Sequence, residues 1–459
     1  MSIVRKGPLQ DGKREEKALP SRWAIDVRPL RVPPYRRMWL GNAVSMFGFQ
    51  FTAIAVPVEM YDITGGSFWV GLLGLAGLLP LLVFGLWGGA VADVVDRRRL
   101  LLASSTLMWL STLGLLAQAL AGVENPVLLL GLVAAQSTAF AVSSPARGAI
   151  IPRLVPTALV PAANTLNYTT HQACAVFGPL TAGLIFAAWS YDVALPIAYG
   201  VDALLFSVSM WATIRLPAIP PESDPAEERD ATPAGGAAVG RSGTPSGRRA
   251  SFGLRGILDG FRYLATAPVL LLSFAIDVIA MVLAMPRTLF PEVAQERFGG
   301  GTAVGWLYSA IAIGSVLGGL TSGWIGRVRR QGVALVVAVV GWGLAVALAG
   351  LAQQLWLVVG LLALAGAADL VSAVFRQSML LVYVPDRMRG RLQGINTVVV
   401  AGGPRLGDLR AGASAAAFGV GTAWVGGGVA AAVLAVLLAL AFPALLRYRV
   451  AAADRTAGP

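Results

Sequence analysis

The chain has 459 residues, of which 56% are hydrophobic and only 13% are charged, and its mean hydropathy is +0.69. A soluble domain carries roughly a quarter charged residues, so this composition excludes an ordinary soluble globular protein. The formal net charge of +12 would suit a nucleic-acid binder, but the basic residues lie in tails and short segments between long apolar blocks. We therefore expect a membrane protein that binds no nucleic acid.

Twelve apolar blocks are long enough to cross a bilayer as helices, since one crossing needs about 20 mostly apolar residues. The predicted spans are 38–60, 67–92, 99–121, 126–150, 158–188, 193–214, 268–291, 303–325, 332–352, 355–383, 392–418 and 421–446. Several are rich in Gly and Ala, which let helices approach closely in lipid. The pattern predicts an all-α polytopic membrane protein.

A polar segment divides the spans into two groups of six. Residues 216–252 are rich in Pro, Gly, Ser and charge and cannot bury enough apolar surface to fold, which predicts a flexible cytoplasmic linker. The following segment "GLRGILDGFRYLAT" predicts a short interfacial helix. The expected organisation is a basic cytoplasmic tail (1–37), an N-terminal six-helix bundle (38–215), the linker (216–252), the interfacial helix (253–266), a C-terminal six-helix bundle (267–447) and a cytoplasmic tail (448–459).

Basic residues gather on one side of the predicted spans. They are abundant before the first span and recur in alternate loops, for example at Arg97, Arg98 and Arg99. Cytoplasmic loops carry an excess of Lys and Arg, so both termini are predicted to be cytoplasmic, in a multi-pass protein of the cell's cytoplasmic membrane. Residues 1–37 lack the short apolar core of a secretory signal.

The two groups of spans also resemble each other in sequence. "RGAIIPRLVP" begins at Arg147 and "RQSMLLVYVP" begins at Arg376, an offset of 376 − 147 = 229. Matches in register are Gly183 with Gly412 at this offset, and Gly71 with Gly305 at an offset of 234. Parallel six-helix repeats are found in transporters whose substrate site lies between the halves near the bilayer midplane.

The segment "GGAVADVVDRRRLL" at 88–101 resembles the major facilitator signature Gly-x-x-x-Asp-(Arg/Lys)-x-Gly-(Arg/Lys)-(Arg/Lys). Val94 replaces a basic residue of that signature, and Asp96 replaces its glycine. An acidic residue at the latter position is similar to the enterobactin exporter branch, as are "YRRMWLGNAVS" and "GWLYSAIAIGSVLGGLTSG". The resemblance covers most of both halves, and drug exporters of the same wider group share these features.

This resemblance implies the major facilitator fold, with two pseudo-symmetric bundles of six helices. It also implies a cytoplasmic gate at the loop between the second and third spans, formed by Gly89, Asp93, Arg97, Arg98 and Arg99. The alternative is a loop that merely follows the positive-inside rule.

The same resemblance implies a secondary active transporter that exports small amphipathic molecules, siderophore-like or drug-like, by alternating access coupled to protons. A broad multidrug pump and an importer of a small metabolite remain alternatives. With one His, one Cys and no phosphate-binding Gly-Lys-Ser/Thr loop, the sequence offers little for enzymatic or metal chemistry. We expect a monomer without cofactor or metal.

Ionisable residues within the spans are candidates for the proton or substrate pathway, since a charge at the bilayer centre costs roughly 3 kcal/mol on insertion scales. The candidates are Asp202, Asp277, Asp369, Arg405, Asp408, His171, Arg147 and Arg376. Asp277 and Asp202 are predicted to lie near the middle of their spans, which makes either one a hypothetical carrier of the coupling proton.

Each candidate also has a plain structural interpretation. The carboxylates could make inter-helix hydrogen bonds, and His171 could be a buried hydrogen-bonding residue. Arg147 and Arg376 could anchor helix ends at the cytoplasmic interface. Arg405 and Asp408 are three residues apart and are predicted to pair on one helix face beside a break at "AGGP". Arg287 is predicted to lie near the outer end of the seventh span.

Overall fold

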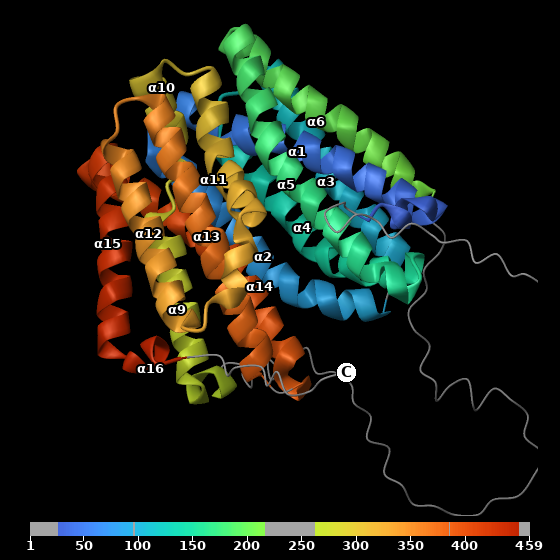
Figure 1. Ribbon diagram of the computed structural model, residues 1–459. Coiled ribbons are helices and arrows are strands. Elements are labelled where there is room, and N and C mark those ends of the chain that lie inside the picture. Colours follow the sequence, from blue (N-terminus) through green and yellow to red (C-terminus); the bar gives the residue numbers. More distant parts are fainter. Residues whose placement is uncertain (1–25, 95–96, 216–261, 385, 449–459) are drawn as a thin grey trace, which may run out of the picture.

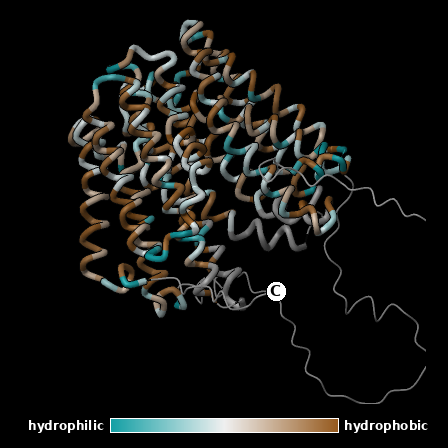
Figure 2. The backbone as a smooth tube through the Cα atoms, in the orientation of Figure 1, coloured by the Kyte–Doolittle hydropathy of each residue, from teal (hydrophilic) through white to brown (hydrophobic). Residues whose placement is uncertain are grey.

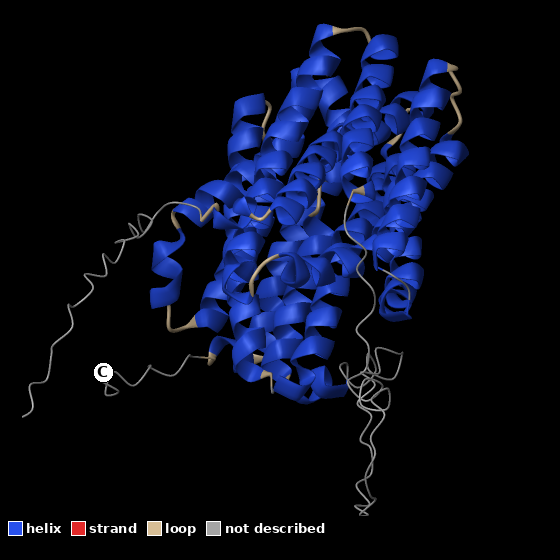
Figure 3. Cartoon of the chain, turned by 90° about the vertical axis from the view of Figure 1, so that its right-hand side faces the viewer, coloured by secondary structure: helices blue, strands red, loops and turns tan. Residues whose placement is uncertain are grey.

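The computed structural model describes residues 26–94, 97–215, 262–384 and 386–448. Within these ranges the side chains of 86–94, 97–98, 145–149, 152–153, 381–383, 386–391, 393–394 and 397 are not described. Every regular element in the described ranges is a helix (Figures 1 and 3). The predicted linker 216–252 lies outside the described residues, as do most of 253–266 and of 448–459.

The N-terminal half contains six long helices. They are α1 (Pro33–Thr64), α2 (Ser67–Val94), α3 (Arg97–Leu120), α4 (Pro126–Leu154), α5 (Val160–Ala188) and α6 (Tyr191–Ile214), with short 3-10 turns η1 (Arg28–Arg31) and η2 (Thr157–Leu159). The first helix starts inside the segment predicted to be a tail. Its far end is set by Gly65, which adopts a left-handed φ of 63° as the helix terminates. Asn125 caps α4 by accepting hydrogen bonds from the backbone N–H groups of Val127 and Leu128.

The C-terminal half repeats this plan with more interruptions. Its elements are α9 (Pro268–Ala284), η3 (Arg287–Leu289), α10 (Phe290–Phe298), α11 (Thr302–Leu320), η4 (Ser322–Arg327), α12 (Gln331–Leu351), α13 (Leu355–Tyr383), α14 (Asp386–Phe418), α15 (Val420–Ala441) and α16 (Pro443–Leu446). Among the described residues, eleven spans are long and apolar enough to cross a membrane, with α9 to α10 counted as one. The twelfth crossing is α14, which is 33 residues long but contains three charged residues in its second half.

Two predicted details are wrong. The sequence predicts one helix over 268–291 for the seventh span, but α9 ends at Ala284 and the chain continues through η3 and α10 to Phe298. The sequence "AGGP" predicts a break in the eleventh span, but α14 runs through Pro404 without interruption. The real break in this half therefore lies in the seventh crossing.

The hydropathy pattern fits a bilayer environment. Figure 2 shows hydrophobic residues along the flanks of both halves, while hydrophilic residues concentrate near helix ends and at a few internal points. Large apolar side chains such as Leu204, Leu320 and Leu440 are exposed on these flanks. An apolar exterior with isolated internal polar groups is what a lipid solvent requires, because unpaired polar groups are costly there.

The two halves meet along two helix pairs. In Figure 1, α2 lies beside α14 and α5 beside α11, and both pairs are in extensive contact. The backbones approach closely where glycines face each other. A Cβ at Gly183 would lie 2.7 Å from the Cα of Gly305, and a Cβ at Gly71 would lie 3.1 Å from the Cα of Gly412. These are the glycines that the internal repeat relates.

Both glycine contacts lie toward the end of the bundle that carries the α1–α2 turn. We call this the outer end, after the orientation that the basic loops at the opposite, basic end predict. Two further contacts join the halves at the outer end: the hydroxyl of Ser67 donates to Glu292, and that of Tyr61 lies 3.4 Å from Glu296 Oε1. Toward the basic end, a Cβ at Gly85 would have no neighbour within 4 Å. The described contacts between the halves run from the outer end to the middle of α2, where Gly402 of α14 packs against Leu78.

Candidate transport site

The break in the seventh crossing follows directly from its sequence. Pro286 has no backbone N–H for the helical ladder and restricts the preceding residue, so Met285 adopts an extended conformation with ψ of 116°. The chain then turns through η3 and restarts as α10, with Pro291 in its first turn. Interrupted membrane helices leave backbone groups free of the helical ladder, and such breaks form binding sites in transporters.

Arg410 of α14 supports the end of α9. Its Nε donates to the carbonyl of Val282 at 3.1 Å, and its terminal nitrogens donate to Leu283 and, at 3.3 Å, to Ala423 of α15. The last carbonyls of a helix have no partner within it, and a cation there also complements the helix dipole. Arg410 therefore stabilises the broken helix from a neighbouring element.

Charged groups from three elements meet on the other side of the break. Asp408 Oδ1 of α14 accepts a hydrogen bond of 2.9 Å from the Thr288 hydroxyl of η3. Arg287 of η3 interacts electrostatically with Asp408 and with Asp369 of α13. Tyr308 of α11 joins them, with its hydroxyl 3.3 Å from the Arg287 carbonyl oxygen. We call Arg287, Asp369 and Asp408 the break cluster.

Arg287 is the accessible member of the break cluster. Its side chain is exposed, although Pro286 and Thr288 on either side of it are buried. The turn η3 that carries it packs against α14 of its own half and against α2 of the other half. The break cluster therefore lies where the two halves meet, with one guanidinium exposed.

Arg405 does not pair with Asp408 as predicted. Its guanidinium donates to the backbone carbonyl of Gly77 in α2, across the boundary between the halves. The approach is possible because α2 presents glycine to α14: a Cβ at Gly74 would lie 2.8 Å from the Asp408 Cβ. Arg405 and Asp408 still interact electrostatically, but each has its hydrogen-bond partner on a different element.

Arg376 is buried rather than anchored at the interface. It forms an ion pair with Asp277 of α9, and the two side chains are 8% and 1% exposed. The pairing joins α13 to α9 inside the C-terminal half. A buried charge needs a partner, so the two residues are best understood as one unit.

Asp202 is also enclosed, but without a described cation beside it. Its Oδ2 accepts a hydrogen bond of 2.5 Å from Thr52 of α1, and it lies against the backbone of α1 at Gly48. Sequence reasoning did not identify a second polar network in this half: Glu59 accepts hydrogen bonds of 2.5 Å from Gln118 and from Tyr199. The hydrogen bonds of Asp202 and those of Glu59 both link α1 to other helices of the N-terminal half.

His171 is exposed on α5, with its Nδ1 3.3 Å from Gln172 Oε1, so the expectation of a buried histidine is wrong. The predicted cytoplasmic gate is described only in part. Helix α2 ends at Val94 and α3 begins at Arg97. The exposed Arg99 lies in the first turn of α3. For the other predicted residues of the gate and for Arg147 the structure describes the helical backbone but not the side chains; these residues are Gly89, Asp93, Arg97, Arg98 and Arg147.

Sequence reasoning placed Arg287 near the outer end of its span because the predicted span ends at residue 291. The two prolines Pro286 and Pro291 were the signal that could have found the break. The structure places Arg287 between the end of α9 and α10, five residues before Glu292, which contacts Ser67 at the outer end.

Comparisons with known proteins agree with this architecture. The family model described as "Transmembrane secretion effector" matches residues 24–235. The chain is 26% identical over 438 residues to Enterobactin exporter EntS of Shigella boydii serotype 18 and of Escherichia coli O139:H28, covering 93% of this chain and 96% of each relative.

Solved transporters share the fold at low sequence identity. The nucleoside transporter NupG superposes with a TM-score of 0.69 at 14% identity, covering 91% of this chain and 100% of that one. A bacterial homologue of the human lysosomal transporter Spinster, in an inward-facing and unoccupied conformation, gives 0.68 at 16% identity over 93% of this chain and 100% of that one. Together with the twelve crossings and the paired halves, these likenesses show that the chain has the major facilitator fold and that its sequence is similar to that of the enterobactin exporters.

Proposed function

We propose that this protein exports small amphipathic molecules with an anionic group across the cytoplasmic membrane, by alternating access driven by the proton gradient. The observation that carries the proposal is the break cluster: an exposed guanidinium and two carboxylates at an interrupted helix, where the two halves meet. Arg287 would bind the anionic group of the substrate, since guanidinium groups bind such groups through charge-assisted hydrogen bonds.

Alternating access is supported by where the halves touch. The glycine contacts of α5 with α11 and of α2 with α14 lie toward the outer end, together with the Ser67–Glu292 contact. This arrangement fits a state closed to the outside, and opening would rock the halves about the same glycine surfaces. The gate at Asp93 and Arg97 would close the basic end in the opposite state, with both termini in the cytoplasm. A reporter fused at residue 230 tests that orientation.

For the coupling proton we favour Asp369. Its carboxylate interacts electrostatically with the exposed Arg287, and its side chain is only partly buried. Asp277 is already paired with Arg376, and Asp202 is enclosed between α1 and α6. Export driven by the inward proton gradient requires that protonation of the Asp369 carboxylate and binding of the substrate exclude each other. Asp277, Asp202 and Asp408 remain the alternatives to be tested.

The substrate class comes from the relatives. Enterobactin exporters suggest a siderophore-like molecule, and an anionic siderophore would suit Arg287. A broad multidrug pump is the second candidate, and an importer of a small metabolite is the third.

Everted membrane vesicles separate these possibilities. Proton-driven accumulation of enterobactin, but not of cationic drugs, is expected for the wild type. Arg287→Gln and Asp369→Asn should abolish it, while Arg447→Gln, which changes an exposed arginine at the basic end, should leave it intact. Asp202→Asn, Asp277→Asn and Asp408→Asn, assayed at equal expression, complete the set. Undiminished accumulation by Arg287→Gln would exclude the proposed substrate site. A loss of accumulation confined to Asp277→Asn or to Asp202→Asn would identify that residue, and not Asp369, as the carrier of the coupling proton.

A further inference from the structure

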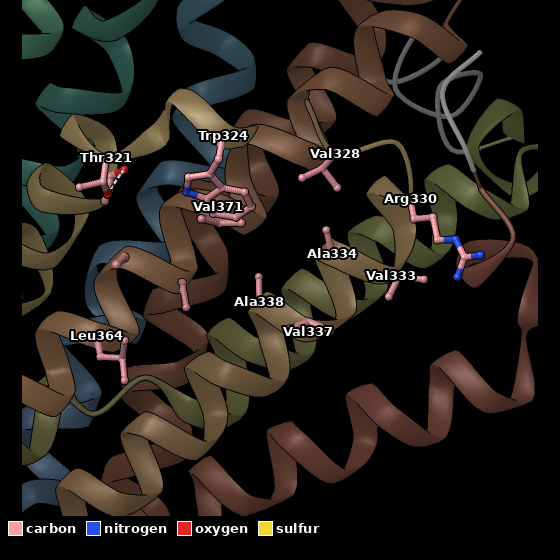
Figure 4. Close-up of a pocket in the computed structure, with 13 residues that line it drawn as sticks. Thr321, Trp324, Val328, Arg330, Val333, Ala334, Val337, Ala338, Leu364 and Val371 are labelled. Carbon is pink, nitrogen blue, oxygen red and sulfur yellow. Dashed lines mark hydrogen bonds between the residues drawn. The ribbon is translucent and has the colours of Figure 1, made fainter. Parts of the chain in front are cut away.

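A pocket of about 510 Å³ lies on the C-terminal half, away from the break cluster. It is bounded by the end of α11, the turn η4, the first turns of α12 and the middle of α13. Figure 4 shows Thr321 and Trp324 on one side, the α12 residues from Val333 to Ala338 on the other, and Leu364 at one end. We call it the α11–α12 groove.

The α11–α12 groove is lined mainly by small or apolar side chains, among them Ala334, Ala338, Ala367 and Ala368. It is open at its side, where Val337 is 64% and Leu364 is 60% exposed. A contiguous exposed apolar surface indicates an interaction site. Since α12 and α13 are membrane spans, this surface faces the hydrocarbon region of the bilayer.

The basic end of the same groove is cationic. Arg330 lines the groove, and Arg327 and Arg329 lie beside it in the chain. None of the three forms an ion pair with another described residue. In Figure 4 the Arg330 guanidinium lies at the end of the groove opposite Leu364. The indole of Trp324, which lies across the groove from α12 in Figure 4, is exposed, and tryptophan favours the membrane–water interface.

The distances match one leaflet of a bilayer. From Arg330 to Ala338 the chain advances eight residues, which is about 12 Å of helix. The hydrocarbon core is about 30 Å thick, so a groove of this depth spans most of one leaflet. The arginines are then at the level of the lipid headgroups, and the alanine-lined part is at the level of the acyl chains.

We propose that the α11–α12 groove is a binding site for an anionic phospholipid of the inner leaflet. The lipid phosphate binds Arg330, with Arg327 and Arg329 adding attraction, and one acyl chain fills the groove between α11 and α12. Basic pockets at the cytoplasmic ends of membrane helices favour anionic headgroups. The site is independent of the proposed substrate and of proton coupling.

The test uses the purified full-length protein in detergent, with bound lipid counted by native mass spectrometry. Dioleoyl phosphatidylglycerol should bind more tightly than dioleoyl phosphatidylcholine. Arg330→Gln should lower the affinity for the anionic lipid by about fivefold, as expected for the loss of one arginine near an anionic headgroup. The control Arg36→Gln, which changes an exposed arginine near the start of α1 in the other half, should leave binding unchanged. Equal affinity for the two lipids, or unchanged binding by Arg330→Gln, would overturn the proposal.

A second pair of variants tests the acyl chain. Val337→Trp fills the groove from an exposed position, so it should reduce binding of both lipids without destabilising the core. Val433→Trp places the same side chain on the exposed flank of α15 and should have no effect. Inorganic phosphate and glycerol 1-phosphate, which lack acyl chains, should not compete with the lipid at equal concentration. Full competition by either compound would show a site for free anions and contradict the proposal. An equal loss of lipid binding in the two tryptophan variants would show a non-specific effect and also contradict it.

Discussion

Gly183 of α5 and Gly305 of α11 meet backbone to backbone across the two halves, so that a Cβ on Gly183 would lie 2.7 Å from the Gly305 Cα. The internal repeat relates this pair to Gly412 and Gly71, which make the equivalent contact between α14 and α2. Small residues are needed at both crossings because helices in lipid associate through close packing.

Gly183→Val should therefore prevent tight closure of the outer end. Overpacking of this kind costs about 1–3 kcal/mol, enough to shift the balance of states by about tenfold or more toward an open outer end. Labelling of a cysteine introduced at Ser67 with a membrane-impermeant maleimide should rise accordingly, and transport should fall. Gly360→Val is the matched control, since a Cβ there would have no neighbour within 4 Å. The same labelling in both variants would contradict the role of the crossing.

Ser67→Ala and Tyr61→Phe remove hydroxyls that contact Glu292 and Glu296 of the other half. A net hydrogen bond contributes about 1 kcal/mol, so each change should favour the outward-open state by about fivefold. The distance between spin labels on the outer ends of α1 and α11 would report the change by pulsed electron resonance. Ser322→Ala is the control and should leave that distance distribution as in the wild type, because the described hydrogen bond of the Ser322 hydroxyl is to the Gly319 carbonyl in its own turn.

Asp277 and Arg376 should depend on each other for stability. Because the pair is buried, Asp277→Asn or Arg376→Gln alone is expected to cost about 3–5 kcal/mol by leaving the other charge uncompensated. The double variant Asp277→Asn with Arg376→Gln should recover much of that loss. The free energy of unfolding of the three variants can be measured in graded denaturing detergent. If the two single losses of stability add up to the loss in the double variant, the two side chains do not interact.

Arg410→Gln should destabilise the break in the seventh crossing. It removes a cation that donates to the carbonyls of Val282, Leu283 and Ala423, and a hydrogen bond to a charged group contributes about 1.5–3 kcal/mol. We expect a clear drop in thermal stability and faster hydrogen exchange over α9 and α10. Arg36→Gln changes an exposed arginine near the start of α1 and serves as the control. Unchanged exchange over α9 would mean that the break is stable without Arg410.

Much of the architecture can be predicted from local sequence. The lengths of the apolar blocks indicate twelve crossings because the bilayer demands about 20 apolar residues for each. The register that relates Gly183 to Gly412 and Gly71 to Gly305 is a property of the sequence alone. That these four glycines come together in two contacts between the halves could not be deduced from it, since the repeat says which positions are equivalent and not which ones touch.

The partners of the intramembrane charges could not be predicted for the same reason. Counting residues along a span estimates depth, but it does not say which neighbour a side chain faces. Depth alone places Arg376 near an interface and Arg405 beside Asp408, whereas Arg376 is buried against Asp277 and Arg405 reaches the Gly77 carbonyl. Hydropathy and spacing, which act along the chain, determined the membrane helices and their two-fold plan. The packing of α9, α13 and α14 against each other and α2, which acts across the chain, decided which charges are paired and left Arg287 exposed at the break.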